Sequence, residues 1–90
     1  MTHEADEQTL AEIVRSRLER AFSPSYLEVV DESVQHHGHA AHHAGNKHLA
    51  IIITAQDLKN LSRVESHRKI YALLTDLMPE PLHALRIMIN

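Results

Sequence analysis

The stretch "HLAIIIT", residues 48–54, has the composition of a β-strand. β-Branched residues are enriched in strands, and successive side chains of a strand point to opposite faces. Leu49, Ile51 and Ile53 therefore share one face, which we expect to lie on the core, while His48 lies on the opposite, less buried side. Because the side-chain period is two, a register error of one residue would exchange these faces.

Two further elements are predicted on the N-terminal side of this strand. "YLEVVDES", residues 26–33, also has strand composition. Over residues 9–22, apolar side chains recur at spacings of three and four, as in an amphipathic helix; they are Leu10, Ile13, Val14, Leu18 and Ala21. Pro24 ends this helix, since proline lacks a backbone donor and disfavours helical backbone at the residue before it.

Three segments follow the strand on its C-terminal side. "AQDLKNLS", residues 55–62, is polar and irregular, with at most a short helical turn. A second helix is predicted over residues 63–78, begun by a capping box of Ser62 and Glu65. Its apolar positions are Val64, Ile70, Tyr71, Leu73, Leu74 and Leu77. "PEP" stops this helix, and "LHALRIMI", residues 82–89, is a last strand.

The order of these elements predicts an α+β fold, α-β-β-α-β, as a two-layer sandwich. A three-stranded sheet with both helices on one face is the simplest way to cover the apolar faces. We expect a flexible N-terminal tail at residues 1–8 and one domain over residues 9–90. The side chains expected in the core are Leu18, Val29, Ile51, Ile53, Leu74 and Ile87.

Composition excludes several classes of function. The chain has 90 residues, a net charge of −3 and no cysteine, so it offers nucleic acid no long-range attraction and cannot build a disulfide or a thiolate site alone. No apolar run approaches the about 20 residues of a membrane span, and the acidic start resembles no targeting peptide. We therefore expect a cytoplasmic protein without membrane association.

Histidine is concentrated in one segment. "VQHHGHAAHHAG", residues 34–45, holds five of the nine histidines: His36, His37, His39, His42 and His43. The run is internal and interrupted, unlike an expression tag. Imidazole is a common metal ligand, so a metal site and a solvated polar loop both fit this pattern.

Three segments together resemble the BolA family. They are "LEVVDES" (27–33), "SRVESHRKIY" (62–71) and "LHALRI" (82–87), and the similarity extends from about Ile13 to Ile89. The resemblance implies a KH-like (type II) fold and a role as an adaptor in iron–sulfur cluster assembly, trafficking or iron regulation. One departure is that Leu58 and Asn60 stand where the family usually has an aromatic residue and a glycine in the turn before the second helix.

The resemblance also implies a partner and a cofactor. The partner is a monothiol glutaredoxin, and the two proteins share a [2Fe-2S] cluster together with glutathione. The isolated protein is expected to hold no cofactor and to be a monomer, with a weak homodimer as the alternative. Since this chain has no thiol, its ligands to iron must be histidines.

By position in the family pattern, the ligand residues are His83, in "HAL", and His36, in the loop after the first strand. His39 is the stand-in for His36, and His37 is a weaker alternative. Regular strand alternation would place His83 on the same face as Leu85. A core-edge histidine bonded to a backbone carbonyl is therefore the competing interpretation of His83.

A DNA-binding transcription regulator of stress response and cell morphology is the alternative function. Arg63, Arg68 and Lys69, at the start of the second helix, would then contact phosphates, or else a protein partner. The chain lacks the GXXG clamp of KH domains, so we expect only weak DNA binding. No catalytic motif is present in the sequence, and an enzyme is not expected.

Overall fold

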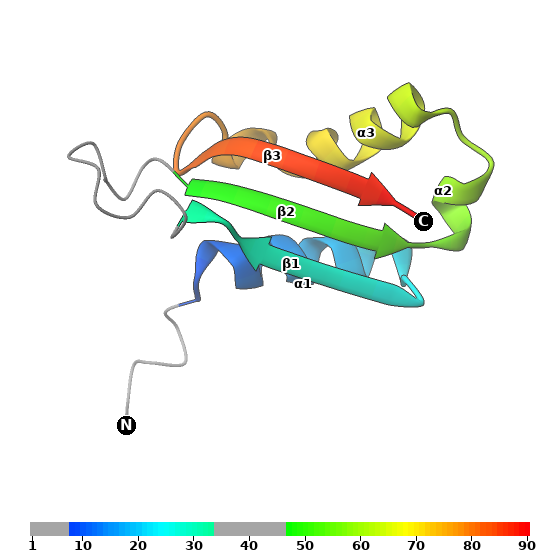
Figure 1. The fold of residues 1–90 in the computed structure, drawn as a ribbon, viewed down its shortest axis with the longest axis horizontal. Helices are drawn as coiled ribbons and strands as arrows, with labels where there is room; N and C mark the ends of the chain where they lie inside the picture. The colour runs from blue at the N-terminus through cyan, green and yellow to red at the C-terminus, as the bar shows by residue number, and fades with distance from the viewer. Residues whose placement is uncertain (1–7, 34–46) are drawn as a thin grey trace.

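The computed structural model describes residues 8–33 and 47–90. Its elements are α1 (Leu10–Phe22), β1 (Tyr26–Asp31), β2 (Lys47–Thr54), α2 (Gln56–Lys59), α3 (Arg63–Ala72), the 3-10 helix η3 (Thr75–Leu77) and β3 (Leu82–Ile89). Figure 1 shows α1 and α3 on one side of a three-stranded sheet, which confirms the predicted fold class. In the described part of the chain, no helix has the length and apolar character that crossing a bilayer requires.

β2 is the central strand of the sheet. It pairs antiparallel with β1 and parallel with β3. Ile51 and Ile53 are fully buried, which confirms the predicted register. Val29 and Ile87, also predicted to be buried, are only partly so, because they lie on the two edge strands and have a neighbouring strand on one side only.

α1 begins and ends as its sequence predicts. Thr9 and Glu12 form a reciprocal capping box, and Ser23, just before the proline, adopts a left-handed conformation that closes the last turn. Val14 and Leu18 are fully buried against the sheet. Ala21, an apolar position of the predicted helix, is exposed, because it lies beside the stripe of residues four apart, Val14, Leu18 and Phe22, that packs on the core.

α3 buries a narrower stripe than predicted. The capping box of Ser62 and Glu65 is present. The buried positions of α3 are Ser66 and Ile70, one turn apart, and Leu74, just after the helix, continues the same stripe. Val64, an apolar position of the predicted helix, is 59% exposed, and Tyr71 is exposed as well; neither belongs to that stripe.

α3 also ends earlier than predicted. The helix was expected to reach residue 78, but it stops at Ala72 and is followed by η3. The N–H groups of Leu73 and Leu74 already bond three residues back, to Ile70 and Tyr71. Arg17 of α1 then stabilises this ending: its Nη1 donates to the carbonyl of Leu73 at 2.8 Å and to Asp76 Oδ1 at 2.7 Å. Leu77 N–H then bonds to the carbonyl of Leu74, three residues back, instead of to Leu73.

We predict that Ile51→Ala lowers the free energy of unfolding by about 2–5 kcal/mol, because it opens a cavity in the centre of the core. Ile52→Ala, on the open face of the same strand, is the matched control and should cost clearly less. Urea unfolding followed by circular dichroism measures both. Equal losses at the two positions would mean that β2 does not present its odd-numbered side chains to the core.

The Arg17–Asp76 pair should contribute a pH-dependent part of the stability. The hydrogen bond from Arg17 holds the pKa of Asp76 below its ordinary value of 3.8. A lowered pKa means that this stabilisation is present above pH 3.8 and disappears as the pH falls through the folded-state pKa. Thermal unfolding should therefore show Asp76→Asn below wild type at pH 7, and the difference should close in acid.

Arg17→Met is the companion variant, because it also removes the bond to the Leu73 carbonyl. Its loss of stability should exceed that of Asp76→Asn at pH 7 and should persist in acid. An acid-independent difference between wild type and Asp76→Asn would contradict the assignment of the ion pair.

Candidate histidine site

A β-bulge sets the position of His83. Lys47 pairs with Leu82 while its neighbour His48 pairs with Ala84, so His83 is an extra residue on β3. The bulge lets Leu82 be fully buried on the core side although Leu85 also packs there, three positions later. His83 is exposed, so the prediction that it shares the core face is wrong, and so is the core-edge interpretation.

His48 and His83 lie side by side at this end of the sheet. Their ring centroids are 5.6 Å apart and their planes are tilted by 40°. The pairing was not predicted, because regular alternation put the two residues on opposite faces. A signal was present: Leu82 and Leu85, which both pack on the core side, are an odd number of positions apart, and regular strand alternation would put them on opposite faces.

Hydrogen bonds fix the end of β1 against His48. Its backbone N–H donates to Ser33 Oγ at 2.9 Å, and its carbonyl accepts from Glu32 N–H at 2.7 Å. Ser33 N–H in turn donates to Asp31 Oδ1. Burial alone would raise the pKa of Asp31, but the Ser33 hydrogen bonds and the charge of Lys47 outweigh it, so the pKa is lowered. Asp31 is thus a carboxylate that helps to order this end of the sheet.

An ion pair crosses the open face of the sheet. Arg86 on β3 binds Glu32, which follows β1, with its Nη2 2.5 Å from Glu32 Oε2. The pair therefore spans β2, on the face opposite the helices. The hydrogen bond from Arg86 lowers the pKa of Glu32. Ala50, the β2 partner of Arg86 in the ladder, is only 1% exposed, although the described helices α1 and α3 lie on the other face of the sheet (Figure 1).

The structure describes only one of the predicted iron ligands, His83. His36, His39 and His37 lie outside the described residues. The described ranges, 8–33 and 47–90, contain no group of three or more histidine, aspartate or glutamate side chains that could hold a metal ion. Among these residues His83 offers one exposed imidazole, but not a complete set of metal ligands.

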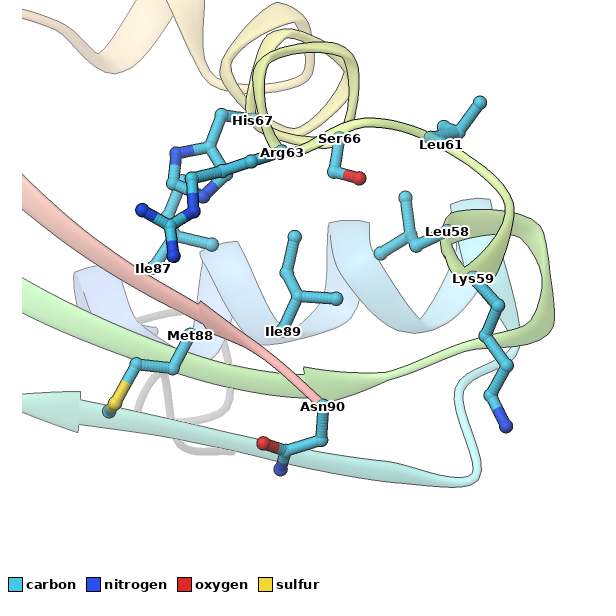
Figure 2. A pocket seen from close by; sticks show the side chains of 10 residues that line it. All are labelled: Leu58, Lys59, Leu61, Arg63, Ser66, His67, Ile87, Met88, Ile89 and Asn90. Atoms are coloured by element: carbon cyan, nitrogen blue, oxygen red, sulfur yellow. The ribbon is translucent and has the colours of Figure 1, made fainter.

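The basic residues predicted to contact phosphates or a protein partner lie on α3, away from the His48–His83 pair. Arg63, Arg68 and Lys69 are exposed on α3. Arg63 lines a cavity of about 730 Å³ between the α2–α3 segment and the end of β3 (Figure 2). His67 is half-buried and lines the same cavity.

This cavity has an apolar floor and a basic rim. Leu58, Ile87 and Ile89 form the apolar part, and Lys59 approaches from the α2 side (Figure 2). Leu58, which replaces the usual aromatic residue of the resemblance, is buried. Asn60, which replaces the usual glycine, has φ −98°, a value open to any residue, so the turn forms without glycine.

Comparisons with known proteins agree with this architecture. The family model described as BolA-like protein matches residues 18–90. The DNA-binding transcriptional regulator BolA of Haemophilus influenzae is 28% identical over 79 residues, covering 88% of this chain and 74% of that protein. SufE-like protein 1 of Arabidopsis thaliana is 40% identical over 79 residues, covering 82% of this chain but only 21% of that longer protein.

The solved BolA domain of SufE1 from Arabidopsis thaliana has the same fold. It superposes with a TM-score of 0.78 and 34% sequence identity, and the match covers 93% of each chain. Since the family model covers most of the sequence and the α-β-β-α-β architecture matches throughout, the chain belongs to the BolA family.

Proposed function

We propose that this protein is a BolA adaptor that docks a monothiol glutaredoxin and shares a [2Fe-2S] cluster with it through histidine. The observation that supports this function best is the exposed imidazole of His83, held on a strand by a bulge and turned away from the core. A strand-borne, solvent-facing ligand suits a metal centre carried by a partner. The proposal describes a binding and transfer module, not an enzyme.

The number of residues between Ser33 and His36 limits how far the second proposed ligand, His36, can be from this end of the sheet. Ser33 is the last described residue before the histidine-rich segment, and its hydroxyl binds the backbone of His48, whose ring adjoins His83. His36 is three residues further on, and three extended residues span at most about 11 Å. His36 is thus within reach of this end of the sheet, with His39 as its substitute.

Two kinds of ligand would then hold the cluster. The partner's cysteine and glutathione supply thiolates, because this chain has none, and His83 with His36 supplies imidazoles. A [2Fe-2S] cluster with imidazole in place of thiolate on one iron has a raised reduction potential. What the adaptor itself contributes is the position of His83 and the docking surface around it.

His83→Ala should abolish the change in the cluster spectrum that this protein causes in holo-glutaredoxin, since the strand-borne ligand has no substitute. His36→Ala should only weaken the change, because His39 can take its place. Visible absorption and circular dichroism of the purified mixture measure both effects. His67→Ala, a histidine toward the other end of the sheet, is the control and should behave as wild type.

One outcome would contradict the assignment of His83 as a cluster ligand. If His83→Ala keeps the wild-type spectrum while still binding glutaredoxin, His83 is not a ligand. Size-exclusion chromatography of the apo proteins separates loss of docking from loss of ligation.

DNA regulation is the second candidate, favoured by the similarity to the DNA-binding transcriptional regulator BolA of Haemophilus influenzae and by the basic residues of α3. Any DNA affinity should be weak, indifferent to sequence and steeply dependent on salt, because phosphate contacts would supply it. Fluorescence anisotropy at two salt concentrations tests this, with Arg63→Gln and Arg68→Gln as variants. Tight, sequence-specific binding at physiological salt would favour the regulator over the adaptor.

A further inference from the structure

The imidazole rings of His48, at the start of β2, and His83, at the start of β3, are close neighbours. We propose that His48 and His83 form a two-imidazole site that binds a divalent ion such as Zn²⁺ in the isolated protein. This site goes beyond cluster sharing, because it requires neither glutaredoxin nor a cluster. It also adds a ligand, His48, that the family pattern did not indicate.

The distance between the rings is close to that of a chelate. Two imidazoles bound in cis positions, with metal–nitrogen bonds of about 2.0–2.1 Å, have ring centres about 4.5–5.2 Å apart. The observed separation is 5.6 Å, and the 40° tilt is not that of parallel stacked rings. A small rotation about the side-chain bonds of the exposed His83 closes the remaining gap.

Both residues are held by the backbone before any ion arrives. His48 lies in the central strand and is bonded to Ser33 and Glu32 through its backbone N–H and carbonyl. His83 lies in the bulge opposite it. Ligands held on paired strands lose little conformational freedom on binding, which favours ligation by this pair.

The surrounding charges favour a cation without completing its coordination. Asp31 and Glu32 both interact electrostatically with His48. However, Asp31 is paired with Lys47 and Glu32 with Arg86, so neither carboxylate is the obvious third ligand. Water therefore fills the open positions, and the affinity should be well below that of a structural zinc site with four protein ligands.

Zn²⁺ is a suitable probe because imidazole is one of its preferred ligands and because the ion has no redox chemistry of its own. If the adaptor proposal also holds, an ion bound to His83 occupies the same imidazole that the cluster needs. Zinc would then compete with cluster sharing. That consequence rests on the proposed function, whereas zinc binding itself does not.

The test removes the competing loop histidines first. In a tag-free protein with His36, His37, His39, His42 and His43 all replaced by Asn, titration calorimetry with ZnCl₂ should show one ion per chain. In that background, His48→Ala and His83→Ala should each weaken binding by at least about tenfold, as loss of even a supporting residue around a metal costs about 10–100-fold. His67→Ala is the matched control and should leave binding unchanged.

Imidazole nitrogen spectra supply a second readout. Zinc should shift the ring nitrogens of both His48 and His83 and leave those of His67 in place. His48→Gln, which keeps a polar side chain, guards against a folding defect and should lose zinc as His48→Ala does. If the loop-substituted protein binds no zinc, any zinc held by the wild type is adventitious chelation by the replaced histidines; if His48 variants bind zinc normally, the ion is held elsewhere. Either result overturns the proposal.

The same variants distinguish this proposal from the adaptor function. Placed in the otherwise wild-type chain, which keeps His36 and His39, His48→Ala should leave the cluster spectrum with glutaredoxin unchanged, whereas in the loop-substituted chain it should weaken zinc binding. Zinc binding to the pair without any cluster spectrum in the wild type would leave the site intact and overturn only the adaptor function.

Discussion

Pairing of β2 on both of its edges is the constraint on which the rest of the structure depends. The strand buries Leu49, Ile51 and Ile53 under the two helices and fixes the register of β1 and β3 at the same time. Because a slip of one residue would turn these side chains to the open face, the register is strongly specified. β1, β3 and the packed helices then take their positions from this one strand.

The bulge at His83 follows from that constraint. β3 must place Leu82 as well as Leu85 on the core side, and regular alternation cannot bury both. One extra residue resolves the conflict, and that residue is the histidine. Because Leu82 and Leu85 both pack on the core side, the extra residue between them, His83, is exposed beside His48. The packing of the core and the position of the imidazole therefore have the same local cause.

Most of the fold could be predicted from the sequence, because apolar periodicity reports burial directly. The helix starts, the strand faces of β2 and the element order all have local signals, such as the Ser62–Glu65 capping box. The early end of α3 has no such local signal, because the residue that binds its last turn, Arg17, is 56 residues away in the sequence from the Leu73 carbonyl. The His48–His83 contact was missed for a similar reason, since it depends on pairing between strands.

The two candidate functions occupy different parts of the same small domain. The histidines lie where β2 and β3 begin, whereas Arg63 and the basic cavity lie where β3 ends. His83 is the second residue of β3, and the cavity is lined by Ile87 to Ile89, so the two regions are separated along the strand by roughly 13–20 Å at about 3.3 Å per residue. Ligation of a metal centre and contact with phosphates therefore do not compete for the same side chains, and variants at one end test one function without removing the other.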